Sequence, residues 1–202
     1  MNIITFENTP PLPLEPHFKY IKAANYLMQH LINMMEDPIY VETGVSAGRS
    51  ISFILQKCPS IKRAYGVDFW SENTDTFERS GDTHYSQQHC DRSLQAARNR
   101  VLSSGHKDKV TLIKEDVAVA VDHFEDNSID LLFLDHYLNK KDVEECLPMW
   151  YNKVKVGGYF AGHDWIYAGV KKSVLNFREQ YDIKPLLSVS GGEWVWKKDG
   201  NI

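Results

Sequence analysis

The sequence has few cysteines, no long hydrophobic run and no excess of positive charge. Cys58, Cys90 and Cys146 lie far apart without a Cys-x-x-Cys pair, which argues against a disulfide scaffold or a zinc site. The net charge of -4 argues against a nucleic-acid partner, since such proteins bind phosphates through clustered Lys and Arg. No apolar run approaches membrane-spanning length and the N-terminus lacks a signal pattern, so we expect a cytoplasmic protein without a membrane partner.

Two familiar phosphate-binding motifs are also missing. Residues 42–50 (ETGVSAGRS) have the glycine spacing G-x-x-x-G rather than G-x-G-x-x-G, and no Gly-Lys-Ser/Thr follows. This stretch lies between an expected strand at 38–41 and a helix that opens at Ser50. Gly44 and Gly48 would let the backbone approach a ligand, and the helix N-terminus offers unpaired N–H groups. Such glycines also serve close packing, so the stretch alone leaves both roles open.

Strand and helix patterns alternate along the chain. Residues 1–16 contain four prolines and predict an extended arm, while 17–202 predict a single domain. Strands are expected at 38–41, 64–68, 110–113, 129–135, 159–161, 186–189 and 193–196, the last two as a hairpin. Helices are expected at 17–36, 50–55, 90–102, 117–124, 142–153 and 170–181, with a Gly-Gly turn at 157–158. The alternation predicts an α/β fold with a doubly wound, mainly parallel seven-stranded sheet and a C-terminal antiparallel hairpin.

Two further features concern function. Residues 69–90 are polar, rich in aromatic and histidine side chains and long for a loop, so we expect an insertion that acts as a lid. Five predicted strands end at or near an acid: Glu42, Asp68, Asp116, Asp135 and Asp164. Because ligands bind beyond the carboxyl ends of parallel strands, and gathered carboxylates repel without donors or a cation, we predict one shared site there.

Two of these acids suggest parts of a nucleotide. Asp68 follows Gly44 at the distance expected of a carboxylate that accepts hydrogen bonds from ribose hydroxyls. Asp116 could accept an adenine amino proton or could cap the helix that starts at Val117, and the two roles can coexist.

The order of the motifs resembles that of class I S-adenosylmethionine-dependent methyltransferases. The motifs are ETGVSAGRS, YGVDFW, ED, LLFLDHY and VGGYFAGHDW, and together they cover residues 39–164. Residues 133–137 (FLDHY) are similar to catechol O-methyltransferases, and 135–181 to small O-methyltransferases that modify antibiotic sugars. The resemblance implies a Rossmann-like fold, S-adenosylmethionine as cofactor and methylation of a hydroxyl on a small metabolite or sugar.

The resemblance also assigns a cofactor-binding set. It implies contacts to the methionine part, to the ribose through Asp68, to the adenine face through Phe69 or Trp70, and to the adenine edge. The residues of the methionine part are Glu42, Gly44, Ser46, Gly48 and Ser50, those of the adenine edge are Asp116 and Val117, and Asp135 and His136 lie beneath the sulfonium.

A metal site is implied in part. Asp135 and Asp164 match metal ligands of the relatives, whereas His163 replaces their third ligand. The two carboxylates would suit Mg²⁺, and all three residues would suit a transition metal. Alternatively, His163 simply hydrogen-bonds a neighbouring acid. The use of a divalent cation therefore stays open.

The general base of the relatives does not carry over, because Leu138 and Tyr137 occupy the two relevant positions. His136 and His163 become the preferred candidates, since imidazole titrates near neutral pH, and with Asp135 they form the predicted catalytic set. A nicotinamide-dependent oxidoreductase and a catalytically silent cofactor-binding protein remain the alternatives. The expected partner is a small hydroxyl acceptor, and a homodimer is left open.

Overall fold

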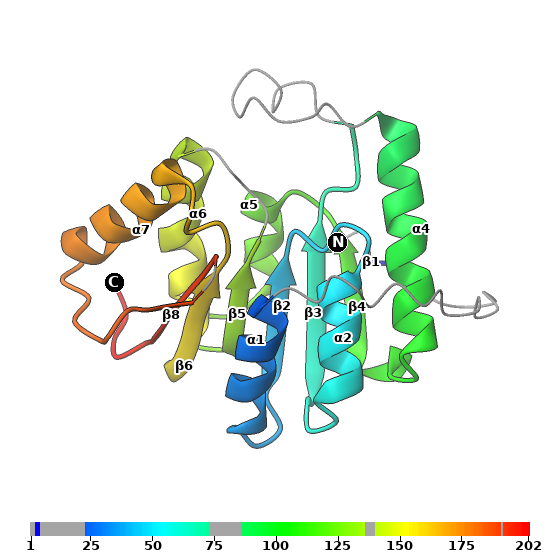
Figure 1. Ribbon diagram of the computed structural model, residues 1–202, viewed down its shortest axis with the longest axis horizontal. Coiled ribbons are helices and arrows are strands. Elements are labelled where there is room, and N and C mark those ends of the chain that lie inside the picture. Colours follow the sequence, from blue (N-terminus) through cyan, green and yellow to red (C-terminus); the bar gives the residue numbers. More distant parts are fainter. Residues whose placement is uncertain (1–2, 5–22, 73–85, 136–139, 191) are drawn as a thin grey trace.

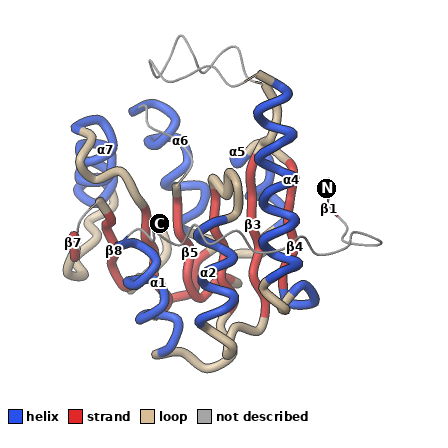
Figure 2. Tube along the Cα trace, turned by 45° about the vertical axis from the view of Figure 1, so that its right-hand side comes forward, coloured by secondary structure: helices blue, strands red, loops and turns tan. Residues whose placement is uncertain are grey.

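The computed structural model describes residues 3–4, 23–72, 86–135, 140–190 and 192–202. Its centre is an eight-stranded sheet in the order β1-β4-β3-β2-β5-β6-β8-β7 (Figures 1 and 2). The parallel strands are β2 (Ile39–Thr43), β3 (Arg63–Asp68), β4 (Val110–Lys114), β5 (Ile129–Leu134) and β6 (Val154–Gly162). β8 (Glu193–Lys197) lies antiparallel between β6 and β7 (Ser188–Ser190). The predicted fold class is confirmed.

The eighth strand lies in the predicted N-terminal arm. Ile3 and Ile4 form β1, which pairs antiparallel with β4 through Ile113 and Leu112. The rest of the arm at 1–16 lies outside the described residues, as do residues 73–85 of the expected lid.

Helices cover both faces of the sheet. α1 (Ala23–Asn33), α2 (Arg49–Lys57) and α4 (Gln87–Ser103) share one buried apolar cluster, and α5 (Val117–Ala120), α6 (Lys140–Tyr151) and α7 (Ala168–Gln180) share the other. Neighbouring strand residues alternate between the two clusters, as Tyr40 and Val41 do, because successive side chains of a strand point to opposite faces. In the described part of the chain, no helix combines the length and apolar character that a bilayer crossing requires.

Several predicted boundaries shift. α4 begins at Gln87, inside the expected lid, because the Ser86 hydroxyl caps it by accepting from the backbone N–H of His89. The helix predicted at 117–124 is split into α5 and a 3₁₀ turn at Val121–His123, and a second such turn, Lys107–Lys109, precedes β4. α1 ends at Asn33 rather than at 36, and residues 17–22 of the predicted helix lie outside the described residues.

The predicted Gly-Gly turn at 157–158 is wrong, because β6 continues through it. The pairing with β5 jumps from Ile129↔Val154 to Leu131↔Tyr159, so the extra residues form a bulge. Gly157 takes a φ of 88°, and a Cβ on Gly158 would lie 2.7 Å from the Asp130 carbonyl oxygen. The glycines thus serve an irregular strand rather than a strand boundary.

Candidate active site

The predicted acids gather at one edge of the sheet. Strands β2 to β6 run parallel, so their carboxyl ends lie together at the top of Figure 1. Glu42 lies near the end of β2, Asp68 ends β3, and Asp116 follows β4. Asp135 follows β5 with its N–H 3.1 Å from the Thr43 carbonyl oxygen, and Asp164 follows β6. The structure therefore brings these five acids to a common edge.

The turn between β2 and α2 depends on left-handed backbone. Gly44, Ser46 and Gly48 have φ values of 76°, 49° and 75°. Gly48 also packs against α4, because a Cβ there would lie 2.7 Å from the Ala97 Cα. Close packing, one of the two roles left open for these glycines, therefore accounts for Gly48.

Asp68 holds this turn in shape. Its Oδ2 accepts from the Ser46 N–H at 2.7 Å and its Oδ1 from the Trp70 N–H at 2.9 Å. The Trp70 indole N–H donates to the Ser46 carbonyl at 2.8 Å, and Arg100 donates to the Ala47 carbonyl at 2.6 Å. Burial raises the pKa of Asp68, and the backbone N–H groups oppose that rise.

The two aromatic candidates for the adenine face differ in exposure. Trp70 is 3% exposed and belongs to the core cluster under α2, whereas Phe69 is 41% exposed. Phe69 is therefore the one of the pair that a ligand can reach in this conformation. At the adenine-edge position, Val117 is buried, and Asp116 caps α5 by accepting from the Ala118 N–H at 2.8 Å. The capping role is thus present, and it can coexist with the expected contact to the adenine.

Buried polar groups lie behind the expected methionine position. The Tyr40 hydroxyl donates to Glu42 Oε2 at 2.8 Å, and Glu42 is 1% exposed. Burial, and then the negative charge of Glu42, raise the pKa of Tyr40 well above its ordinary value. The Ser50 hydroxyl donates at 2.9 Å to Asn25, a buried residue of α1. Sequence reasoning missed Tyr40 and Asn25, because each fits the regular pattern of its strand or helix.

Asp135, His163 and Asp164 form the predicted metal cluster. One ligand atom from each lies within 4.8 Å of the other two. His163 Nδ1 is 2.7 Å from Asp164 Oδ1 and 3.4 Å from Asp135 Oδ1, and each side chain is about one-sixth exposed. Two carboxylates and an imidazole are a donor set that suits a divalent cation. The hydrogen bond from His163 to a neighbouring acid, the alternative role, is also present.

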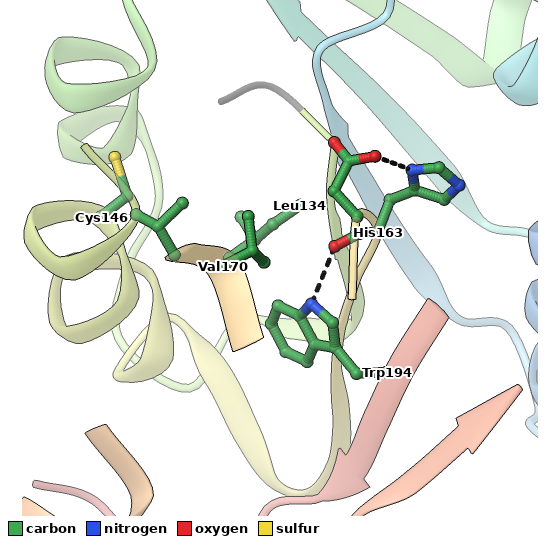
Figure 3. A pocket seen from close by; sticks show the side chains of 7 residues that line it. Leu134, Cys146, His163, Val170 and Trp194 are labelled. Carbon is green, nitrogen blue, oxygen red and sulfur yellow. Dashed lines mark hydrogen bonds and ion pairs between the residues drawn. The ribbon is translucent and has the colours of Figure 1, made fainter. Parts of the chain in front are cut away.

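Trp194 on strand β8 contacts the backbone of Gly162 and His163, next to this cluster. The Trp194 indole N–H donates to the His163 carbonyl at 3.0 Å, and a Cβ on Gly162 would overlap the same indole. Figure 3 shows the His163 ring directed away from Cys146 and Val170, which line a small apolar pocket. The other lining residues are Leu134, Val143, His163, Asp164 and Trp194. His136, also predicted for catalysis and cofactor binding, lies outside the described residues.

The strand order and the acid-bearing edge agree with the class I S-adenosylmethionine-dependent methyltransferases that the sequence resembles. The sequence profile of a family described as a methyltransferase domain matches residues 41–165, which is more than half of the chain. The chain belongs to that family and is a methyltransferase. This assignment sets aside the nicotinamide-dependent alternative.

Solved structures share the fold at low sequence identity. The O-methyltransferase NovP matches with a TM-score of 0.63 and 17% identity over 88% of this chain and 80% of its own. A Staphylococcus aureus protein assigned as a caffeoyl-CoA O-methyltransferase matches with a TM-score of 0.61 and 14% identity over 88% and 84%. The precorrin 8W decarboxylase of Methanobacterium thermoautotrophicum matches with a TM-score of 0.59 and 16% identity over 85% of this chain and 86% of its own. A search of curated protein sequences found no match.

Proposed function

We propose that this protein transfers a methyl group from S-adenosylmethionine to a hydroxyl of a small metabolite or sugar, assisted by a divalent cation. The observation that carries the proposal is the convergence of Asp135, His163 and Asp164 at the carboxyl ends of β5 and β6. This cluster adjoins the edge where Glu42 and Asp68 are expected to hold the cofactor. NovP, an O-methyltransferase by name, has the same fold and supports oxygen as the acceptor atom.

The geometry of the turn supports the cofactor contacts that the resemblance implies. Asp68 keeps the turn at residues 44–48 in place and offers a carboxylate to the ribose hydroxyls. Phe69 is exposed enough to cover the adenine. Asp135, directly after β5, is the residue for which the resemblance implies a place beneath the sulfonium.

The residues around the cation site would align the acceptor for in-line displacement. A divalent cation at this site would lower the pKa of the acceptor hydroxyl. Asp135 and Asp164 would hold that cation and so fix the hydroxyl toward the methyl group.

His163 cannot fill both of its predicted roles at once. Its Nδ1 faces the two carboxylates, where the cation is expected. If Nδ1 binds the cation, the lone pair of that nitrogen is used, and Nδ1 can no longer accept the proton of the acceptor hydroxyl. We assign His163 to the cation and leave the proton of the acceptor hydroxyl to a different group. We keep the expectation of a cytoplasmic protein without a nucleic-acid or membrane partner as part of this proposal, and a homodimer stays open.

The test combines binding with turnover. Calorimetry with S-adenosylmethionine and its demethylated product should give saturable binding, and a panel of catechols and sugar nucleotides should give methylated product. Chelation should abolish product and Mg²⁺ or Mn²⁺ should restore it. Binding without product across the panel would favour the catalytically silent alternative, and absence of binding would refute the proposal.

A further inference from the structure

Glu193 on β8 has no function in the site described so far. It is 2% exposed, and its Oε1 lies 3.5 Å from His163 Nε2. Within the described part of the chain, its Oε2 has no hydrogen-bond partner. Burial of a carboxylate without adequate partners is destabilising, so the position of this one points to a role.

The two nitrogens of His163 face different partners. Nδ1 lies toward Asp135 and Asp164, whereas Nε2 lies toward Gly192 and Glu193. A Cβ on residue 192 would be 3.3 Å from Nε2, so glycine keeps that side of the ring open. The Trp194 indole N–H donates to the backbone carbonyl of His163, and this hydrogen bond fixes the backbone from which the imidazole side chain extends.

This arrangement matches a general rule of metal sites. A histidine that binds a metal through one ring nitrogen almost always donates its other N–H to a carboxylate, a backbone carbonyl or water, which fixes the tautomer and the ring orientation. Glu193 lies on the Nε2 side, across the ring from Asp135 and Asp164. It is therefore placed to orient His163 and not to share the ion with them.

We propose that Glu193 is a positioning residue that accepts the Nε2–H of His163 and so presents Nδ1 to a divalent cation between Asp135 and Asp164. This inference rests on the cation site of the proposed function and adds the residue that selects imidazole as its third ligand. The separation of 3.5 Å becomes a hydrogen bond when the site is occupied, since such bonds are often long in the empty state.

The experiment measures Mn²⁺ binding by the full chain. The variants are Glu193→Gln and Glu193→Ala, and the matched control is Glu125→Gln, the same chemical change at an exposed acid before β5. Free aqueous Mn²⁺, followed by electron paramagnetic resonance, gives the dissociation constant. Pulsed measurements of ¹⁴N coupling report whether an imidazole nitrogen binds the ion. Calorimetry with the demethylated cofactor and a thermal melt monitor the rest of the molecule.

Glu193→Ala should raise the Mn²⁺ dissociation constant about 10- to 100-fold and remove the nitrogen coupling. Glu193→Gln should have a smaller effect, because an amide oxygen still accepts a hydrogen bond but carries no charge. Glu125→Gln should match the wild type, and cofactor affinity should stay constant in all variants. If Glu193→Ala fails to fold, the Mn²⁺ dissociation constant and the nitrogen coupling of Glu193→Gln test the inference.

Wild-type Mn²⁺ affinity and nitrogen coupling in the folded Glu193 variants would overturn the inference and leave the proposed function standing. Mn²⁺ bound to the wild type without nitrogen coupling would overturn it as well. A wild type that binds the cofactor and methylates its acceptor without taking up Mn²⁺ would remove the cation site and, with it, this role of Glu193. If the wild type does not bind the cofactor at all, the proposed function itself is refuted.

Discussion

Replacement of Asp68 by Asn tests the cofactor site with the smallest change of shape. The Asp68 carboxylate accepts one backbone N–H on each oxygen, from Ser46 at 2.7 Å and from Trp70 at 2.9 Å. An asparagine keeps one acceptor but places an NH₂ group against the second donor. The variant therefore loses the charge and one of the two hydrogen bonds that shape the turn.

The expected magnitude follows from these contacts. A hydrogen bond to a charged group contributes about 1.5–3 kcal/mol, and a ribose hydroxyl that donates to Asp68 belongs to this class. Since each 1.4 kcal/mol corresponds to about tenfold in affinity, Asp68→Asn should raise the cofactor dissociation constant about 10- to 100-fold. Distortion of the turn acts in the same direction.

Titration calorimetry with the demethylated cofactor measures this effect, and Asp130→Asn provides the control. Asp130 accepts from the Ile39 N–H at 2.8 Å and pairs with Lys155, but it lies near the amino end of β5. Asp130→Asn should leave cofactor affinity unchanged. If folded Asp68→Asn binds the cofactor within about threefold of the wild type, Asp68 does not hold the ribose.

Three further predictions concern catalysis and stability. Asp135→Ala should lower kcat by about 10²-fold with little change in cofactor affinity. Steady-state kinetics measures kcat and calorimetry measures the affinity; a loss of cofactor affinity with unchanged kcat would contradict this prediction. Tyr40→Phe removes the donor to buried Glu42 and should lower the free energy of unfolding by about 2 kcal/mol in urea titrations, whereas Tyr181→Phe at a 37% exposed site should not. Burial lowers the pKa of Lys198 to about 8 from 10.5, so between these values the unfolded chain binds more protons than the native one. As pH rises through that window, the free energy of unfolding of the wild type should therefore increase by on the order of 3 kcal/mol relative to that of Lys198→Met. A difference between the two proteins that does not change with pH would contradict the lowered pKa of Lys198.

The acid-bearing edge could be predicted from the sequence because it depends on local patterns. Each strand is an apolar run followed by a carboxylate, and parallel pairing brings Glu42, Asp68 and Asp135 to the same edge whatever the details of packing. The meeting of Asp135, His163 and Asp164 follows from that topology together with the resemblance to methyltransferases. The roles of these residues toward cofactor and metal remain predictions.

The features that sequence reasoning missed depend on tertiary contacts. Glu193 reads as an ordinary residue of a hairpin, and only the insertion of β8 beside β6 brings it to His163. Trp70 was a candidate for the adenine face, and the sequence did not predict its burial, which a left-handed φ of 41° and a hydrogen bond to Ser46 accompany. Gly157 and Gly158 read as a turn, because a bulge and a turn require the same backbone freedom.

The position of β8 makes the cluster of Asp135, His163 and Asp164 depend on a segment that follows it in the chain. A chain folded only through α7 already contains Asp135, His163 and Asp164, but lacks Trp194, which lies 31 residues beyond the histidine it braces. A partner protein or a tag that pulled the final hairpin off β6 would spare the nucleotide half of the molecule and loosen the imidazole. Substitutions in the hairpin of β7 and β8 should therefore disturb the His163 side of the site without any contact to the turn at residues 44–48.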